Sequence, residues 1–192
     1  MGCSILKSRG KQCKDTLGGL ELIYIFPYVK YAKSLIKRNE LVLTTYPYTL
    51  VRSFEIVSGD YSESATIEDG GDFIDQSLSA TMTGLNQDNE WRKLLKKEHG
   101  VIAKDRNGKF RLLGVYNGLE TDYKATTGGG HSDFNGWTFN FKGKEQDQAL
   151  YFDNLFNVGF LENEDLYNYI ARVEADGGVV ESPSCVVDSG LV

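Results

Sequence analysis

The chain of 192 residues is long enough for one hydrophobic core with a small appendage. Its hydrophobic content of 41% and charged content of 25% are ordinary for a globular domain, and 21 glycines beside only 3 prolines favour tight turns over Pro-rich linkers. The net charge of −6 argues against a general DNA-binding or anionic-membrane-binding protein, because affinity for phosphates comes from clustered Lys and Arg.

Residues 1–19 are predicted to form an extended, basic N-terminal arm. The arm carries Lys7, Arg9 and Lys11 and ends in a pair of glycines. A disordered tail explains the same composition equally well.

Residues 20–29 are predicted to form a strand that is covered on both sides. Leu22 and Tyr24 alternate with Ile23 and Ile25, so both faces of the strand are apolar. Two further strands are expected over 41–46 and 48–57, interrupted by Pro47.

A long β-hairpin is predicted over residues 58–85. Polar and apolar residues alternate over 61–68 and again over 73–85, and the turn signal Asp69-Gly70-Gly71-Asp72 separates the two runs. Because strands average about 5–6 residues, we expect a hairpin of this length to project beyond its own domain.

A helix is predicted over residues 87–98. Trp91, Leu94 and Leu95 form its apolar stripe, and His99 follows at its negative end. Its lysines could be read as a DNA-binding patch, but the helix dipole and the amphipathic pattern already explain them.

A β-meander with two Asn-Gly turns is predicted to follow. Its strands are expected over 101–106, 109–116 and 119–125, with turns at Asn107-Gly108 and Asn117-Gly118. Asn-Gly is the preferred pair for a two-residue hairpin turn, because both residues tolerate positive φ.

The remaining elements are a strand and a helix. Residues 137–142 should form a strand with Trp137, Phe139 and Phe141 pointing inward, and residues 164–173 a short amphipathic helix. The sum is a mainly β chain, an antiparallel β-sandwich or barrel with one mid-chain α-helix and a short C-terminal helix. The domain is expected to span 20–160, and the C-terminal helix and tail 161–192.

No catalytic, cofactor-binding or metal-binding constellation is evident. His131-Ser132-Asp133 has the letters of a catalytic triad, but consecutive residues point in different directions. The acids at the hairpin tip lack the spacing of a calcium loop. We therefore expect a protein that is not an enzyme, although the sequence does not exclude a pair of carboxylates that converge in space.

The cysteines and the hydropathy also bear on location. Cys3, Cys13 and Cys185 form no metal or redox motif and are expected to be reduced thiols in a protein made in a cytosol. No apolar run is long enough to span a membrane.

Four segments in order resemble tail-tube and ring proteins of tailed bacteriophages, especially crAss-like phages. They are the opening GCSILKSRGKQCKDTLGGLELIYI, the hairpin and helix ATIEDGGDFIDQSLSATMTGL–NEWRKLL, the meander GVIAKDRNGKFRLLGVYNGLETDYKATTGG, and the strand DFNGWTFNFKGKE. Together they cover most of residues 1–150.

The resemblance implies a structural virion protein of the tail or head–tail junction, made in the bacterial host cytoplasm. It implies a homo-oligomeric ring of six or twelve copies that contacts neighbouring tail or connector rings and lets double-stranded DNA pass without sequence-specific binding. Subunit contacts are expected at the hairpin tip and the N-terminal arm, at the residues Asp69, Gly70, Gly71, Asp72, Phe73, Lys7, Arg9 and Lys11.

Two other functions stay open. A carbohydrate- or protein-binding β-sandwich predicts a monomer with a surface aromatic cluster around Trp137 or Phe134. A hydrolase predicts a cleft that holds a carboxyl group with a perturbed pKa.

Overall fold

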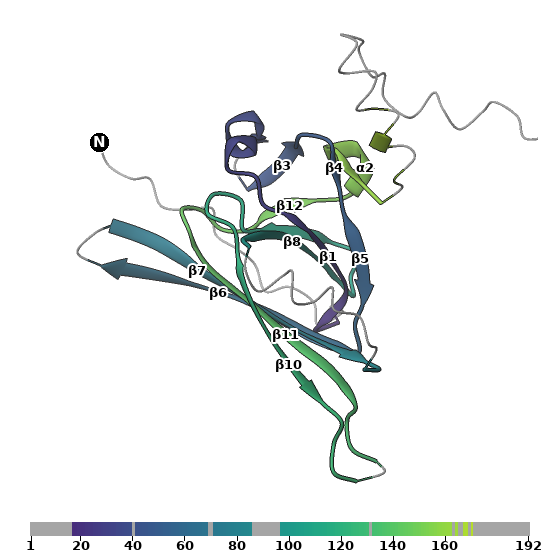
Figure 1. Ribbon diagram of the computed structural model, residues 1–192. Coiled ribbons are helices and arrows are strands. Elements are labelled where there is room, and N and C mark those ends of the chain that lie inside the picture. Colours follow the sequence, from purple (N-terminus) through teal and green to yellow (C-terminus); the bar gives the residue numbers. More distant parts are fainter. Residues whose placement is uncertain are drawn as a thin grey trace, which may run out of the picture.

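A computed structural model of the chain describes residues 17–162 apart from 40, 69–70, 86–96 and 131, and also residues 164, 167, 168 and 170. The fold is mainly β, as predicted (Figure 1). A seven-stranded sheet has the order β2 (Lys37–Asn39), β3 (Val42–Thr45), β12 (Leu150–Phe152), β9 (Phe110–Leu113), β8 (His99–Asp105), β1 (Leu20–Pro27), β5 (Arg52–Glu55). A four-stranded sheet has the order β10 (Glu120–Thr126), β11 (Gly136–Glu145), β7 (Gly71–Thr83), β6 (Ser58–Glu68), and β13 (Phe160–Leu161) pairs with β4 (Thr49–Leu50).

The two larger sheets pack face to face around one apolar core. Ile23 and Val101 project from the seven-stranded sheet, and they meet Leu78, Phe139 and Phe141 of the four-stranded sheet. The alternation of residues in β7 and β11 produces this face, because every second side chain points to the same side of a strand.

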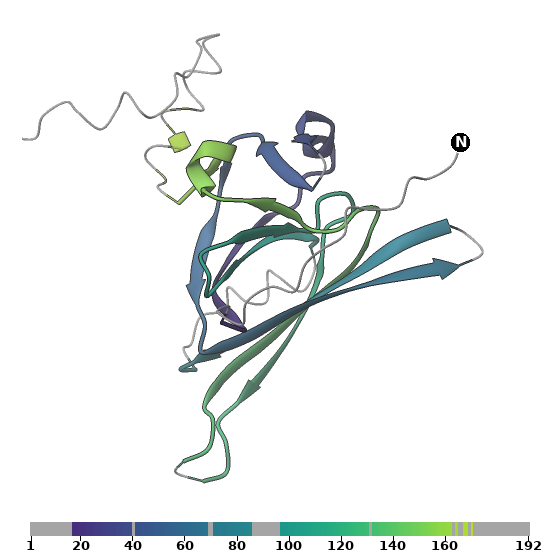
Figure 2. The ribbon, with the colours of Figure 1, turned by 180° about the vertical axis from the view of Figure 1, so that it is seen from behind.

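The other face of the seven-stranded sheet is also covered. Tyr24, Phe26 and Ile102 project from it into a second apolar cluster that Phe160 joins. The 3₁₀ helix η1 (Lys30–Leu35), the short helix α2 (Leu155–Val158) and the β4–β13 pair lie on this side (Figure 2). The prediction that the first strand is covered on both sides is therefore confirmed.

The sheets do not close into a barrel. Among the described residues, the outer strands β2, β5, β6 and β10 each pair with one other strand only. The barrel alternative is therefore wrong, because the chain passes between two separate sheets without a continuous ladder of hydrogen bonds.

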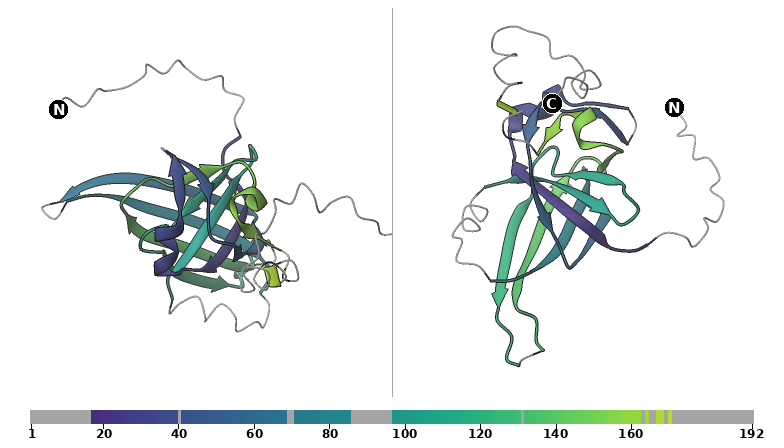
Figure 3. Two further views of the ribbon diagram at one scale, coloured as in Figure 1. Left: turned by 90° about the horizontal axis from the view of Figure 1, so that it is seen from above. Right: turned by 90° about the vertical axis from the view of Figure 1, so that its right-hand side faces the viewer.

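The predicted hairpin is confirmed, and its two strands extend beyond the end of the neighbouring strand β11. Strands β6 and β7 pair in unbroken register from Ser58↔Thr81 to Glu68↔Gly71. Strand β11 accompanies β7 only as far as Ile74, so the end of the hairpin continues as a two-stranded ribbon. This ribbon projects away from the body, and the β10–β11 hairpin projects in another direction (Figures 1 and 3).

The predicted meander is only half correct. A hairpin joins β8 to β9 around Asn107-Gly108 as expected, with Gly108 at a φ of 77°. Its loop is longer than the predicted two-residue turn, because the Asp105 N–H donates to the Lys109 carbonyl. The segment around Asn117-Gly118 is not a hairpin turn, because β9 ends at Leu113 and β10 pairs with β11 in the other sheet.

The predicted helices fall largely outside the described residues. Residues 86–96 are among those not described, and Lys97 and Glu98 are not helical. His99 does not follow a helix end but begins β8, buried at 4% exposure and paired through its backbone with Leu119. In the C-terminal segment, the described residues 164, 167, 168 and 170 are helical.

Candidate functional site

The tip of the β6–β7 ribbon is the first candidate interaction site. Gly71 and Asp72 are exposed there, and Phe73 is half-buried beneath the Lys144 ammonium, which lies 4.0 Å from its ring centroid. The other predicted contact residues, Asp69, Gly70, Lys7, Arg9 and Lys11, lie outside the described residues.

Ile67 is an exposed apolar residue near this tip that sequence reasoning did not single out. It lies on β6 opposite Asp72 and is 83% exposed. Its side chain shares a face with Tyr61, which packs against the core, but the ribbon at Ile67 extends past the sheet that would cover it. The alternation of residues along β6 shows that Ile67 points to the same side as Tyr61. Its exposure cannot be read from this pattern, because it depends on where the neighbouring strands of the sheet end.

Buried polar contacts hold the middle of the hairpin, next to the point where the ribbon leaves the sheet. Gln76 is 2% exposed, and its amide donates to the Glu63 carboxylate and to the Asp147 carbonyl, each at 3.3 Å. Its oxygen accepts the Gly114 backbone N–H at 3.1 Å. Because buried polar groups stabilise only when they are paired, this network joins the two sheets at one relative position.

The two outer strands of the four-stranded sheet form a second candidate site. Strands β6 and β10 lie at opposite ends of this sheet, and each has one free edge among the described residues. Three antiparallel pairings separate them, so they run in opposite directions. Free strand edges expose unpaired N–H and C=O groups that can pair with another chain.

Glu145 is a buried carboxyl with a structural role. It is 1% exposed, and its two oxygens accept the backbone N–H groups of Tyr116 and Asn117 at 2.7 and 3.0 Å. Burial raises the pKa of Glu145 to about 7. These contacts hold the segment in which the chain crosses from one sheet to the other.

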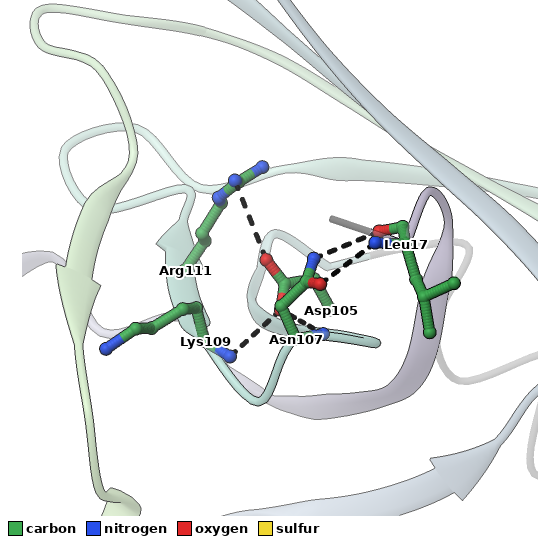
Figure 4. A network of polar contacts seen from close by, with 5 residues as sticks. All are labelled: Leu17, Asp105, Asn107, Lys109 and Arg111. Carbon is green, nitrogen blue, oxygen red and sulfur yellow. Dashed lines mark hydrogen bonds and ion pairs between the residues drawn. The ribbon is translucent and has the colours of Figure 1, made fainter. Parts of the chain in front are cut away.

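A groove of about 840 Å³ lies at one open end of the core. On its rim, the Asp105 carboxylate accepts the backbone N–H groups of Asn107 and Lys109, each at 2.9 Å (Figure 4). The Asn107 amide pairs with both the N–H and the C=O of Leu17, at 3.0 Å each, and so fixes the chain where it enters β1.

Arg111 is one of the residues that line this groove. Its guanidinium lies 5.3 Å from the Tyr61 ring centroid and 5.0 Å from that of Tyr151, and its nearest carboxylate, on Asp105, is 3.8 Å away. Its Nε is buried and has no hydrogen-bond partner among the residues that the structure describes. The groove therefore offers a cation, two aromatic rings and nearby acids to a polar ligand.

Two residues that the sequence analysis singled out, Trp137 and Asp133, make contacts within the chain. Trp137 is half-buried and packs edge-on against Tyr123, with ring centroids 5.4 Å apart. The Asp133 carboxylate accepts the backbone N–H groups of Gly129 and Gly130, and these bonds lower its pKa.

No group of three or more potential metal ligands occurs among the described residues. Within the same part of the chain, no helix is both long and apolar enough to cross a membrane.

Comparison of the chain with models of protein families, with curated proteins and with solved structures found no match.

Proposed function

We propose that the protein is a structural virion subunit that forms a homo-oligomeric ring in a phage tail or head–tail junction. The observation that carries this proposal is that the four-stranded sheet ends in two oppositely directed strands, each paired on one side only within the described part of the chain. The sequence resemblance to tail-tube and ring proteins supplies the biological setting.

Ring closure follows from the direction of these two edges. A copy related by rotation about an axis that runs along the strands keeps its strand directions, so β6 of one copy meets β10 of the next in antiparallel orientation. This contact is heterologous, and repeated heterologous contacts close into a ring when the rotation divides a full turn evenly. The ring removes the free edges that would otherwise promote aggregation.

The solvent face of the four-stranded sheet would line the central channel. This face carries charges of both signs, the acids Asp60, Asp75, Glu120 and Asp122 and the bases Lys124, Lys142 and Lys144. Because acids and lysines are interspersed, the wall gives no basic stripe that would hold phosphates by counterion release. DNA could pass along such a wall without binding.

The hairpin ribbon would contact the adjacent copy or the next ring. A two-stranded ribbon is marginal by itself in water, and the exposed Ile67 adds an apolar group at its end. Both features favour a partner surface for the ribbon in the assembled state.

Light scattering of the full chain over a wide concentration range tests the proposal. For the protein alone we expect a mass several times the 21.4 kDa of one chain, and after addition of the neighbouring tail proteins a complex that holds several copies of this chain. A monomer under all these conditions would contradict it.

The groove around Arg111 favours a second candidate function, the binding of carbohydrate. The pairing of exposed Tyr151 with a partly buried guanidinium offers a stacking surface and hydrogen-bond donors to sugar hydroxyls. Replacement of Arg111 by Met keeps much of the side-chain volume but removes the donors. It should abolish binding in a neutral-oligosaccharide array, and an array without any wild-type binding would rule out this function.

A further inference from the structure

We propose that neighbouring copies join through β6 and β10 in one particular register. This register places Asp60 opposite Lys124 of the neighbouring copy and Tyr61 opposite its Tyr123. The inference rests on the proposed ring and adds the residue contacts at each junction.

The two faces of the sheet restrict the choice of register. Asp60 and Lys124 lie on the solvent face, whereas Tyr61 pairs with buried Leu78 and Tyr123 pairs with buried Phe139. A shift by one residue would turn every side chain of the added strand to the other face. A junction that keeps one face apolar can therefore shift only in steps of two residues.

Charge selects among the registers that remain. The proposed register pairs all of β10, Glu120–Thr126, with residues 58–64 of β6. A shift of two residues in one direction places Asp60 opposite Asp122, and a shift of four places it opposite Glu120. A shift of two in the other direction places it opposite Thr126 and gains no ion pair. Opposite charges directly across antiparallel strands stabilise the pairing, and like charges destabilise it.

The two charged residues are available for this contact. Asp60 and Lys124 are both exposed, and neither takes part in an ion pair with another described residue. Each lies on an outer strand that pairs with only one other strand among the described residues.

The aromatic pair supports the same register. Tyr61 and Tyr123 are both half-buried and pack at opposite margins of the core between the sheets. Their contact across the junction would join the core of one copy to that of the next. Aromatic cross-strand pairs are among the stabilising pairs of antiparallel sheets.

Charge reversal tests the ion pair. The variants Asp60→Lys and Lys124→Asp each place like charges across the junction, so we expect each to raise the concentration for half-assembly by about tenfold or more. The double variant D60K/K124D restores opposite charges and should return it to within about threefold of wild type. Failure of the double variant to recover would overturn the register.

Cross-linking locates the junction directly. In a chain with Cys3, Cys13 and Cys185 replaced by Ser, the pair D60C/K124C should oxidise to a disulfide between copies, because directly opposed residues in antiparallel strands lie within disulfide reach. The pair D60C/D122C is the matched control and should link poorly. Rings that link through 60 and 122 instead would overturn the register while leaving the ring function intact. The absence of rings from the wild-type chain, both alone and with the neighbouring tail proteins, would contradict the ring function itself.

Discussion

Glu145 shows how one residue controls the path of the chain. Its carboxylate binds two backbone N–H groups in the link between β9 and β10, where no sheet ladder satisfies them. Unpaired backbone groups in a buried position are costly, so the side chain takes the place of a strand partner. The sequence does not reveal this role, because Glu145 and Asn117 are brought together only by the pairing of distant strands.

The pKa of Glu145 predicts a pH dependence of stability. Burial raises this pKa from 4.5 to about 7 in the folded state, so between these values the folded chain holds more protons than the unfolded chain. Stability from this group should therefore fall as pH rises through that window, by up to roughly 3 kcal/mol. Urea unfolding of wild type and Glu145→Gln at about pH 5 and pH 8 measures it.

The comparison of the two proteins isolates Glu145 from other groups. Burial lowers the pKa of His99, which acts in the opposite sense on stability, but His99 is present in both proteins. The difference in unfolding free energy between wild type and variant should change with pH. A constant difference would show that Glu145 does not titrate in this range.

Gly136 marks a place where the backbone leaves no room for a side chain. A Cβ built there would lie 2.0 Å from the Met82 carbonyl oxygen, whereas one at Gly129 would meet nothing closer than 3.7 Å. Gly136→Ala should cost about 1–3 kcal/mol in urea unfolding, as overpacked sites do. Gly129→Ala, the control in the same hairpin, should change stability by less than about 0.5 kcal/mol. Equal effects would argue against the close approach of β7 and β11.

At the scale of elements, the alternation of side chains was the informative signal. It predicted the β6–β7 hairpin and the inward face of β11, because a strand with one buried face must place apolar residues at every second position. The pair Asn117-Gly118 led to a wrong prediction of a hairpin turn. Residues that tolerate positive φ also suit a link between two sheets, and this pair lies in such a link. The groove could not be predicted, because Tyr61, Arg111 and Tyr151 come from three separate strands.

The projecting ribbon carries a prediction about assembly. Ile67→Lys should leave the stability of the single chain within about 0.5 kcal/mol of wild type, because Ile67 is 83% exposed. It should weaken assembly about tenfold or more, since an isoleucine that becomes buried contributes roughly 1.5–3 kcal/mol. Sedimentation velocity measures the shift.

Leu35 supplies the matched control for this prediction. It is 57% exposed and lies on η1, on the far side of the seven-stranded sheet from the hairpin. Leu35→Lys should leave assembly unchanged. An equal loss in both variants would indicate a general effect of surface charge instead of a contact at the ribbon.

At the scale of the whole molecule, two open sheets share one core, and among the described residues each sheet ends in two strands that are paired on one side only. The sequence indicated a sandwich or a barrel. Closure into a barrel depends on whether the outer strands pair with each other, and the hydrophobic pattern does not show which strands pair. Because the four-stranded sheet stays open in the described part of the chain, its outer strands β6 and β10 can pair with a second copy. The ring proposal follows from these two outer strands, which another copy can pair with.

Electron microscopy of the full chain, at a concentration where light scattering shows a single assembled species, tests this proposal most directly. The account predicts closed rings with a central channel, in which the β6 edge of each copy meets the β10 edge of the next. A homogeneous population of single particles with both edges free, in the presence of the other tail proteins as well, would contradict it.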